Sequence, residues 1–322
     1  KRRDSMSVFL SNAVIAFLLA EFVLLVLMGI SLFYVVRIVR SWDYNALTSL
    51  QYSLEKQNYL VNTILLFSVC TKIVLFIFFA LCLNELSDIV PGAMCSAGVI
   101  GSNKFGGILM LTKILLIFGL GIWLVINKLD LQALNFPYLK KKYAIFICLF
   151  VMILIELGIE ISFFYNIPLK VPVFCCSVTF QAPKLPFGYT NFGLVSAFFV
   201  LFFVILALNF LKQSMASFVA NLLFLVLSYY AITYFFGLYV YEQPNHKCPY
   251  CMLRSDYFYV GYLIWGTLFL GIFYGLMPYL VEIITKTNYS HKLKFSSIWL
   301  SVCVLICSLY VLKYYLLRGF LF

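Results

Sequence analysis

The sequence contains few charged residues, and this shortage excludes a soluble globular protein. Only 11% of the 322 residues are Asp, Glu, Lys or Arg, whereas 64% are apolar and 19% are aromatic. Such a chain has too little polar surface to cover a water-soluble fold. The composition therefore predicts a membrane protein whose main partner is the lipid bilayer.

Histidine is also scarce, since His246 and His291 are the only two in the sequence. The orientation argued below places them on opposite sides of the membrane, so no haem held by two histidines is expected from this chain alone. The sequence has no P-loop and no glycine-rich nucleotide motif in a strand and helix setting. The net charge of +11 does not call for a nucleic-acid partner, because cationic loops that face anionic lipid account for most of it.

Long apolar runs, in contrast, are frequent. A helix needs roughly 20 apolar residues to cross a hydrocarbon core of about 30 Å, and continuous runs of that length favour helices over the alternating strands of a barrel. The runs predict eight spans, at about 9–36, 59–83, 106–126, 143–164, 192–211, 218–240, 257–283 and 298–316. We therefore expect an all-α polytopic integral membrane protein, with one transmembrane domain over residues 1–322 and no soluble domain.

The short loops predict an orientation, because cytoplasmic loops carry an excess of Lys and Arg. One alternate set of loops holds eleven cations, namely Arg37, Arg40, Lys56, Lys128, Lys140, Lys141, Lys142, Lys212, Lys286, Lys292 and Lys294. The interior loops on the other side hold five, namely Lys104, Lys170, Lys184, Lys247 and Arg254. We expect the first set to face the cytoplasm of a bacterial inner membrane and the second set to face the periplasm.

The ten cysteines divide according to this orientation. Five lie in the loops predicted to face outward and none lies in the inward loops. The five outward residues are Cys95, Cys175, Cys176, Cys248 and Cys251. A periplasm is a compartment in which disulfides form and persist. The other five fall within spans, where cysteine behaves as a small apolar residue, although Cys82 at the outer end of its span could join the outward set.

The sequence Cys-Pro-Tyr-Cys at residues 248–251 stands directly before the span that begins near Tyr257. Two cysteines at this spacing can close a small disulfide ring, and a helix N-terminus favours the thiolate. So small a ring removes little entropy from the unfolded chain, which favours redox exchange over a structural disulfide. A metal site stays open, because the same spacing forms half of many metal sites. Asp256 is expected to cap the helix that follows.

Together with Arg254, this motif at the predicted outer end of a span resembles the membrane disulfide-generating proteins of the DsbB and vitamin K epoxide reductase type. In those families the CxxC pair passes electrons to a quinone, and another cysteine pair in an outer loop exchanges with a periplasmic thioredoxin-fold protein. The resemblance covers about ten residues. It implies a quinone-proximal pair, a nearby cation and a set of shuttle cysteines: Cys248 with Cys251, Arg254, and Cys175 with Cys176 or Cys95.

Two functions of different classes follow from these cysteines. In the first, the protein is a membrane thiol-disulfide oxidoreductase or electron relay that links the outer cysteines to a quinone or to a partner's cofactor. The neighbours Cys175 and Cys176 seldom pair with each other, so one could bond Cys95 while the other attacks the 248–251 disulfide. In the second, the protein is a transporter or a membrane subunit of a transport or respiratory assembly. The outer cysteines would then be structural disulfides or would handle a soft metal such as copper.

Ionisable residues inside the spans form a second candidate site. Lys72, Lys113, Glu156 and Glu160 fall in apolar runs, where each would be costly if it faced lipid. Glu156 and Glu160 are one helical turn apart and so face the same way. They could form buried salt bridges that hold the helices together, or a path for protons or cations. Glu21 is expected to reach an interface by snorkelling.

Overall fold

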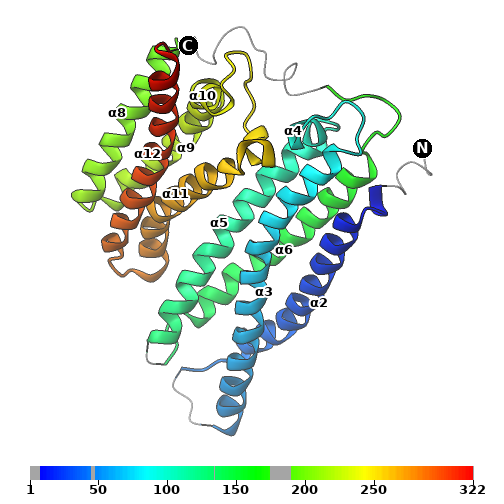
Figure 1. The fold of residues 1–322 in the computed structure, drawn as a ribbon. Coiled ribbons are helices and arrows are strands. Elements are labelled where there is room, and N and C mark those ends of the chain that lie inside the picture. The colour runs from blue at the N-terminus through cyan, green and yellow to red at the C-terminus, as the bar shows by residue number, and fades with distance from the viewer. Residues whose placement is uncertain (1–7, 45–47, 134, 175–189, 322) are drawn as a thin grey trace. The chain divides into compact units, whose positions relative to one another are not determined.

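The computed structural model describes residues 8–44, 48–133, 135–174 and 190–321. These residues are mostly helical and contain no strand. Eight of the helical segments are long and apolar enough to cross a membrane (Figure 1). The prediction of an all-α polytopic integral membrane protein is therefore confirmed.

The helices group into two compact units, each of which is described by itself. Unit 1 comprises residues 1–90 and 100–171, and unit 2 comprises residues 91–99 and 172–322. The segment Pro91–Val99 lies between two helices of unit 1 in the sequence, but its contacts place it in unit 2. The expectation of one transmembrane domain stays a prediction.

Unit 1 is a bundle of four long helices, coloured from blue to green in Figure 1. They are α2 (Asn12–Ser41), α3 (Ser49–Ser87), α5 (Phe105–Gln132) and α6 (Leu139–Tyr165). Helix α2 contacts α3 and α6, and α5 contacts α3 and α6. Large side chains such as Trp123 and Phe146 are fully buried between the helices. The bundle therefore has a continuous interior in which a polar side chain can be shielded from lipid.

Unit 2 contains the four remaining membrane-length segments. They are α8 (Asn191–Phe210); α9 (Ser214–Ala231), which continues through a π-helical turn η2 (Ile232–Phe236) into α10 (Gly237–Tyr241); α11 (Val260–Thr285); and α12 (Leu293–Arg318). Helix α11 contacts α9 and α12, and α8 contacts the same two helices. Short segments complete the unit: α4 (Ser96–Ile100), whose last residue is assigned to unit 1, η3 (Cys251–Leu253), η4 (Ser255–Tyr257) and η5 (Ser290–Lys292). A π-turn inside a helix often marks a functional site, and this one directly precedes α10.

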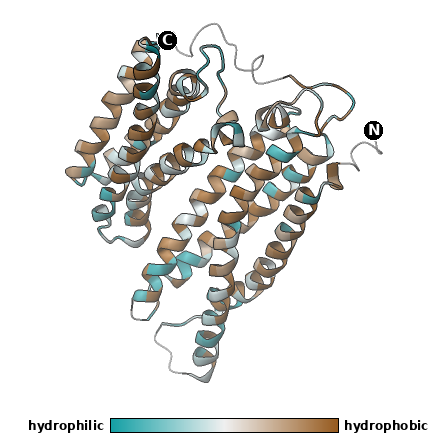
Figure 2. Cartoon of the chain, viewed as in Figure 1, coloured by the Kyte–Doolittle hydropathy of each residue, from teal (hydrophilic) through white to brown (hydrophobic). Residues whose placement is uncertain are grey.

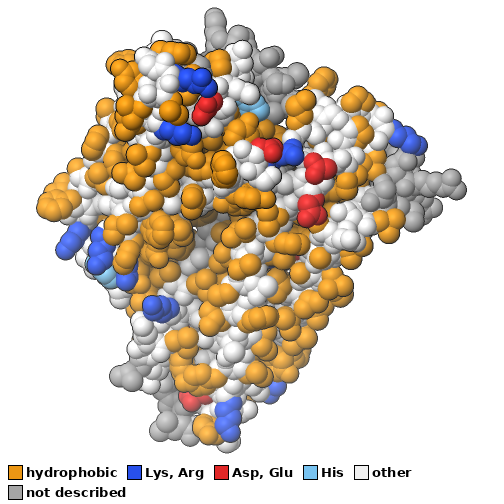
Figure 3. All heavy atoms as spheres, viewed as in Figure 1, with side chains coloured by type: hydrophobic (Ala, Val, Ile, Leu, Met, Phe, Trp, Pro, Cys, Tyr) orange, Lys and Arg blue, Asp and Glu red, His pale blue; other side chains and the backbone are white. Residues whose placement is uncertain are grey.

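The outward faces of the helices are apolar in both units. Figure 2 shows hydrophobic residues along most of the length of the helices, and Figure 3 shows mainly hydrophobic side chains on the face in view. Large side chains such as Phe33, Phe67 and Phe203 are more than half exposed. Extensive exposed apolar surface of this kind fits lipid and not water. The lipid bilayer is therefore the environment for which this surface is built.

The helices begin and end several residues away from the predicted limits. Helix α3 starts at Ser49, ten residues before the predicted position 59, because polar residues fill its first turns and hide them from a hydropathy pattern. Thr48 caps this start by accepting a hydrogen bond from the Gln51 N–H at 3.3 Å. Lys142, predicted as a loop cation, is instead fully buried in α6 with its Nζ 2.7 Å from Asp130 Oδ2. One of the eleven cations counted in the predicted cytoplasmic loops therefore belongs to a buried ion pair.

Candidate functional site

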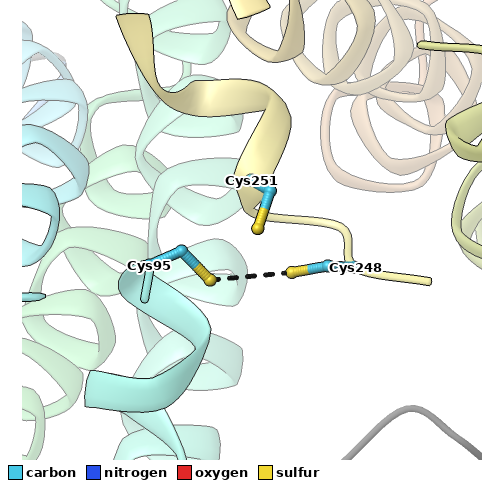
Figure 4. A group of neighbouring side chains, drawn as sticks. All are labelled: Cys95, Cys248 and Cys251. Carbon is cyan, nitrogen blue, oxygen red and sulfur yellow. Dashed lines mark hydrogen bonds between the residues drawn. The ribbon is translucent and has the colours of Figure 1, made fainter. Parts of the chain in front are cut away.

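Three of the five cysteines predicted to face outward meet within unit 2. The sulfurs of Cys95, Cys248 and Cys251 all lie within 4.8 Å of one another. Figure 4 shows them pointing toward a common centre, with Cys95 just before α4, Cys248 in a loop and Cys251 on the turn η3. Cys95 Sγ is 3.8 Å from Cys248 Sγ, although 153 positions separate the two residues in the sequence. A disulfide bond is about 2.05 Å long, so this distance is a close non-bonded contact.

The cluster is shielded from solvent. Cys95 and Cys248 are 0% exposed, and Cys251 is 5% exposed. Reactive cysteines that exchange with other proteins are usually at least partly accessible. Chemistry among these three sulfurs can therefore proceed inside the protein, whereas a folded partner reaches them only if the surrounding loops move.

The loop that carries Cys248 is fixed by hydrogen bonds from two aromatic side chains. The hydroxyl of Tyr241, at the end of α10, donates to the carbonyl oxygen of Cys248 and accepts the N–H of Met252 at 3.0 Å. The indole Nε1 of Trp265 donates to the carbonyl oxygen of Pro249 at 3.0 Å. Because buried backbone groups require partners, these contacts define the shape of the loop.

Tyr250, between the two motif cysteines, contributes through its backbone. Its N–H donates to Cys248 Sγ at an N···S distance of 3.4 Å. A donor of this kind favours negative charge on the acceptor, as hydrogen bonds to the sulfurs of thiolate sites do. Burial raises the pKa of the Tyr250 phenol well above its usual value, and the neighbouring Tyr229 and Cys248 add to the effect. The phenol is therefore neutral and does not serve as a base.

The loop that carries Cys95 is held by a tight backbone contact. Gly92 has a φ of +81°, and a Cβ at this position would lie 2.5 Å from the carbonyl oxygen of Val173. The Val173 N–H donates to the Pro91 carbonyl oxygen at 2.8 Å. Only glycine fits both the left-handed conformation and the close approach. These contacts direct the chain after Gly92 toward Cys95.

Arg254 connects the two loops. Its Nη1 donates to the carbonyl oxygen of Met94, and its Nε lies 3.6 Å from Asp256 Oδ2. The residue next to Cys95 is thereby tied to the segment that follows Cys251. The role of Arg254 as a cation beside a bound quinone stays a prediction, while its observed contacts position the cysteine loops.

The relation between the motif and α11 differs from the sequence prediction in two respects. Cys251 begins a 3₁₀ turn and α11 starts only at Val260, so the helix dipole, which fades within the first turn, does not act on Cys251. Asp256 does not cap α11, because the residue before the helix is Tyr259 and no side chain caps this end. What α11 supplies is close contact, since a Cβ on Gly261 would lie 2.5 Å from Met252 Cγ. The absence of a side chain there lets α11 approach η3.

Three further cysteines were predicted as members or candidate members of the outward set, and the structure does not place them in this cluster. Cys175 and Cys176 lie outside the described residues, so their part in a relay stays a prediction. Cys82 is buried in α3 of unit 1, where Glu160 and Lys113 act on it electrostatically. The contact between Cys95 and Cys248 was not predicted as a pair. Their shared side of the membrane was the one signal in the sequence that pointed to it.

The four intramembrane charges predicted as a site do meet, in the interior of unit 1. Lys113 Nζ lies 2.5 Å from Glu156 Oε1 and 2.6 Å from Glu160 Oε2. Lys72 Nζ lies 2.7 Å from Glu156 Oε2 and 2.5 Å from Glu21 Oε2. All five side chains are at most 6% exposed. The expected buried salt bridges are therefore present, and one carboxylate more takes part than was predicted.

Glu21 is that additional member, and the snorkelling prediction for it is wrong. It is 5% exposed and faces Lys72 on α3 instead of an interface. The sequence separates the two residues by 51 positions, so no local pattern could pair them. Lys72 has two carboxylates to bind, which explains why Glu21 turns inward.

Comparison with known proteins adds no relative to this description. No family model matches the chain, and neither the curated proteins nor the solved structures gave a significant match. Function is therefore argued from the two clusters themselves. The cysteine cluster can exchange disulfides or hold a thiophilic metal, and the charge network can hold a proton or stabilise the bundle.

Proposed function

We propose that the protein is a membrane thiol-disulfide oxidoreductase whose centre is formed by Cys95, Cys248 and Cys251. The observation that carries this proposal is the 3.8 Å contact between Cys95 Sγ and Cys248 Sγ, with Cys251 Sγ within 4.8 Å of both. Exchange requires a disulfide and a third sulfur in line to attack it. Three convergent cysteines are the smallest set that meets this requirement.

The exchange step balances without any outside reagent. In the oxidised centre, Cys248 and Cys251 share a disulfide, and the Cys95 thiolate attacks Cys248 Sγ. The new bond joins Cys95 to Cys248, the old bond breaks, and Cys251 leaves as a thiolate. The 3.8 Å contact supports Cys248 as the sulfur under attack.

The net reaction needs an electron acceptor and an electron donor, both of which we name by class. Oxidation of the Cys248 and Cys251 thiols to a disulfide releases two electrons and two protons, which convert a quinone to a quinol. The disulfide is then reduced by a dithiol on the outer side, which becomes a disulfide in turn. The donor in this proposal is a periplasmic thioredoxin-fold protein, which acts directly or through Cys175 or Cys176, each of these two pairing with another cysteine and not with its neighbour. Other membrane subunits are further partners.

The motif at the predicted outer end of a span supports a lipid-soluble acceptor, because a quinone reaches the protein from the bilayer. The sulfurs are at most 5% exposed, so the quinone contacts them when the surrounding loops move. The Tyr250 N–H bonded to Cys248 Sγ supports the thiolate that the chemistry needs. Arg254 is the cation assigned to the quinone in this proposal.

Quinone chemistry is tested with purified full-length protein and a short-chain ubiquinone analogue under anaerobic conditions. We expect two thiols to be lost for each quinol formed, and mass spectrometry should assign the loss to peptides that contain Cys248 and Cys251. A Cys303→Ser control should leave the stoichiometry unchanged, because Cys303 is buried in α12 and donates to the Ile264 carbonyl oxygen. Unchanged thiol content with excess quinone would contradict the proposal.

The proposed location is a bacterial inner membrane with the cysteine loops in the periplasm. Two exposed positions of unit 2 test this orientation, Gln243 after α10 and Lys212 after α8. In intact cells, a membrane-impermeant thiol reagent should label Gln243→Cys but not Lys212→Cys, and permeabilised cells should show both. The opposite labelling pattern would invert the orientation and remove the oxidising compartment from the proposal.

A second candidate function is favoured by the spacing of the sulfurs. Thiolates around a tetrahedral metal at about 2.3 Å lie about 3.8 Å from one another, which matches the contact between Cys95 and Cys248. Three sulfur ligands suit a soft ion such as Cu(I). The protein would then be a transporter or a membrane subunit of a transport or respiratory assembly.

Anaerobic titration with Cu(I) separates the two candidates. If the cluster is a metal site, we expect the protein to bind one Cu(I) ion in the presence of a competing chelator, and we expect the Cys95→Ser variant to lose this binding. If the cluster exchanges disulfides, we expect quinone to oxidise the Cys248 and Cys251 thiols in the Cys95→Ser variant as well. Tight stoichiometric copper together with thiols that resist quinone would favour the metal function.

A further inference from the structure

The charge network of unit 1 contains one negative charge more than it contains positive charges. Its members are three carboxylates, on Glu21, Glu156 and Glu160, and two ammonium groups, on Lys72 and Lys113. They come from all four helices of the bundle. The Lys113 ammonium also lies over the aromatic rings of Phe17 and Phe79, with Nζ 5.1 Å and 4.5 Å from the two ring centroids. These rings add no full charge.

The five groups form a chain in which carboxylates and ammonium groups alternate, and a carboxylate stands at each end. Glu156 is in the middle, because it bonds both ammonium groups, whereas Glu21 contacts Lys72 and Glu160 contacts Lys113. One carboxylate oxygen of each glutamate nevertheless lies within 4.8 Å of the other two. Two like charges this close in an apolar interior do not both persist, and one carboxyl takes up a proton instead.

Glu160 is the end that is set up to carry that proton. Its Oε2 contacts Lys113, while its Oε1 is buried and has no hydrogen-bond partner among the described residues. Glu160 is 0% exposed, whereas Glu21 is 5% exposed. An unpartnered oxygen at full burial is costly as part of a carboxylate and much less so as part of a neutral acid. The groups that face it are Glu21 of α2, Lys72 and Cys82 of α3, Lys113 of α5 and Glu156 of α6.

We propose that this network is a binding site for a single exchangeable proton, carried on Glu160 of α6. A metal cation fits the site less well than a proton, because the two ammonium groups already occupy carboxylate oxygens and would repel it. A proton needs one oxygen only. The inference does not depend on the chemistry of the cysteines, since it concerns unit 1 alone.

The same unit contains a balanced ion pair for comparison. Lys142 Nζ lies 2.7 Å from Asp130 Oδ2, and Asp130 Oδ1 accepts the Tyr138 N–H at 2.8 Å. This pair holds one charge of each sign and should hold no extra proton. Asp130 is 17 residues beyond Lys113 on α5, which is about 25 Å along a helix. Asp130→Asn is therefore a control that alters a buried carboxylate outside the network.

Infrared spectroscopy of the full-length protein in lipid nanodiscs counts protonated carboxyl groups directly. At neutral pH we expect one buried protonated carboxyl per protein. Glu160→Gln and Glu21→Gln should each reduce the count to zero, because two carboxylates then balance two ammonium groups. Asp130→Asn should leave it at one. In the wild type the signal should disappear as a single-proton step when the pH is raised.

Three results would overturn the proposal. A wild-type spectrum without a buried protonated carboxyl would mean that all three glutamates are ionised and purely structural. A signal that survives in both Gln variants would place the proton elsewhere. A signal that is lost when sodium chloride replaces choline chloride would assign the site to a metal cation. The wild-type spectrum decides the question even if a variant fails to fold.

Discussion

The two units hold their candidate clusters together by different means. In unit 1, full charges from four helices meet in an apolar interior, with ammonium and carboxylate groups 2.5 to 2.7 Å apart. In unit 2, neutral donors such as the Tyr241 hydroxyl and the Trp265 indole fix the loop that carries Cys248. The first cluster should therefore respond most to lost charges. The second should respond to the loss of a single hydroxyl or the gain of a single methyl group.

The largest effect is expected from removing a shared cation of unit 1. Lys113→Met leaves Glu156 and Glu160 without their common partner. Removing one side of a buried ion pair costs about 3–5 kcal/mol. Thermal unfolding in detergent, followed by circular dichroism, should show this loss. Lys128→Met, on the exposed side of the same helix, should change the free energy of unfolding by no more than about 0.5 kcal/mol.

The next comparison lies within the network. Glu156→Gln removes the carboxylate that bonds both ammonium groups, whereas Glu160→Gln replaces a group that we assign as already neutral. We expect a loss of about 3 kcal/mol for the first and about 1 kcal/mol for the second, the size of one hydrogen bond. The same unfolding measurement ranks the two variants. Equal losses would indicate that Glu160 is ionised in the folded protein.

In unit 2, a single methyl group should have a measurable effect. Gly261→Ala places a Cβ 2.5 Å from Met252 Cγ and 2.8 Å from the Met252 carbonyl carbon. Overpacking of this kind costs about 1–3 kcal/mol. Gly266→Ala on the same helix has no atom within 4 Å of its Cβ. The free energy of unfolding of this control variant should equal that of the wild type or slightly exceed it. Similar behaviour of the two variants would contradict the close contact between α11 and η3.

The smaller of the two expected changes in the stability of unit 2 comes from Tyr241→Phe. It removes the hydroxyl that bonds the Cys248 carbonyl oxygen and the Met252 N–H. Unsatisfied buried backbone groups cost about 1–2 kcal/mol here, and the loosened loop should let Cys248 and Cys251 react faster with an alkylating reagent. Tyr315→Phe on the exposed side of α12 should change neither quantity. An unchanged alkylation rate in Tyr241→Phe would show that this hydroxyl does not hold the loop.

Hydropathy was sufficient to predict the eight spans, because each apolar run is long enough to cross a bilayer by itself. It could not predict that α11 begins at Val260, since the intervening 3₁₀ turns contain the same residue types as a helix start. Four members of the charge network were visible as charges in apolar runs. Glu21 was visible in the same way but was predicted to reach an interface, because its partner Lys72 lies on another helix and the pairing depends on tertiary contacts.

The cysteine cluster shows the same limit. The CxxC motif indicated thiol chemistry at residues 248–251, and the loop pattern placed Cys95 on the same predicted side. Nothing in the sequence measures the distance between Cys95 and Cys248, which depends on Gly92 and on the Arg254 contact with Met94. Spatial pairing across 153 positions is information that the fold adds.

The most direct test of the proposed function is to trap the exchange intermediate. In Cys251→Ser the 248–251 disulfide cannot form, so quinone should instead oxidise the thiols of Cys248 and Cys95, which lie 3.8 Å apart, to the Cys95–Cys248 disulfide that the exchange step produces. Membranes are oxidised with quinone and alkylated, and non-reducing peptide mass spectrometry identifies the crosslink. The account predicts a Cys95–Cys248 crosslinked peptide in Cys251→Ser and none in the Cys95→Ser, Cys251→Ser double variant. Cys248 that stays fully alkylated as a free thiol after quinone oxidation would contradict it.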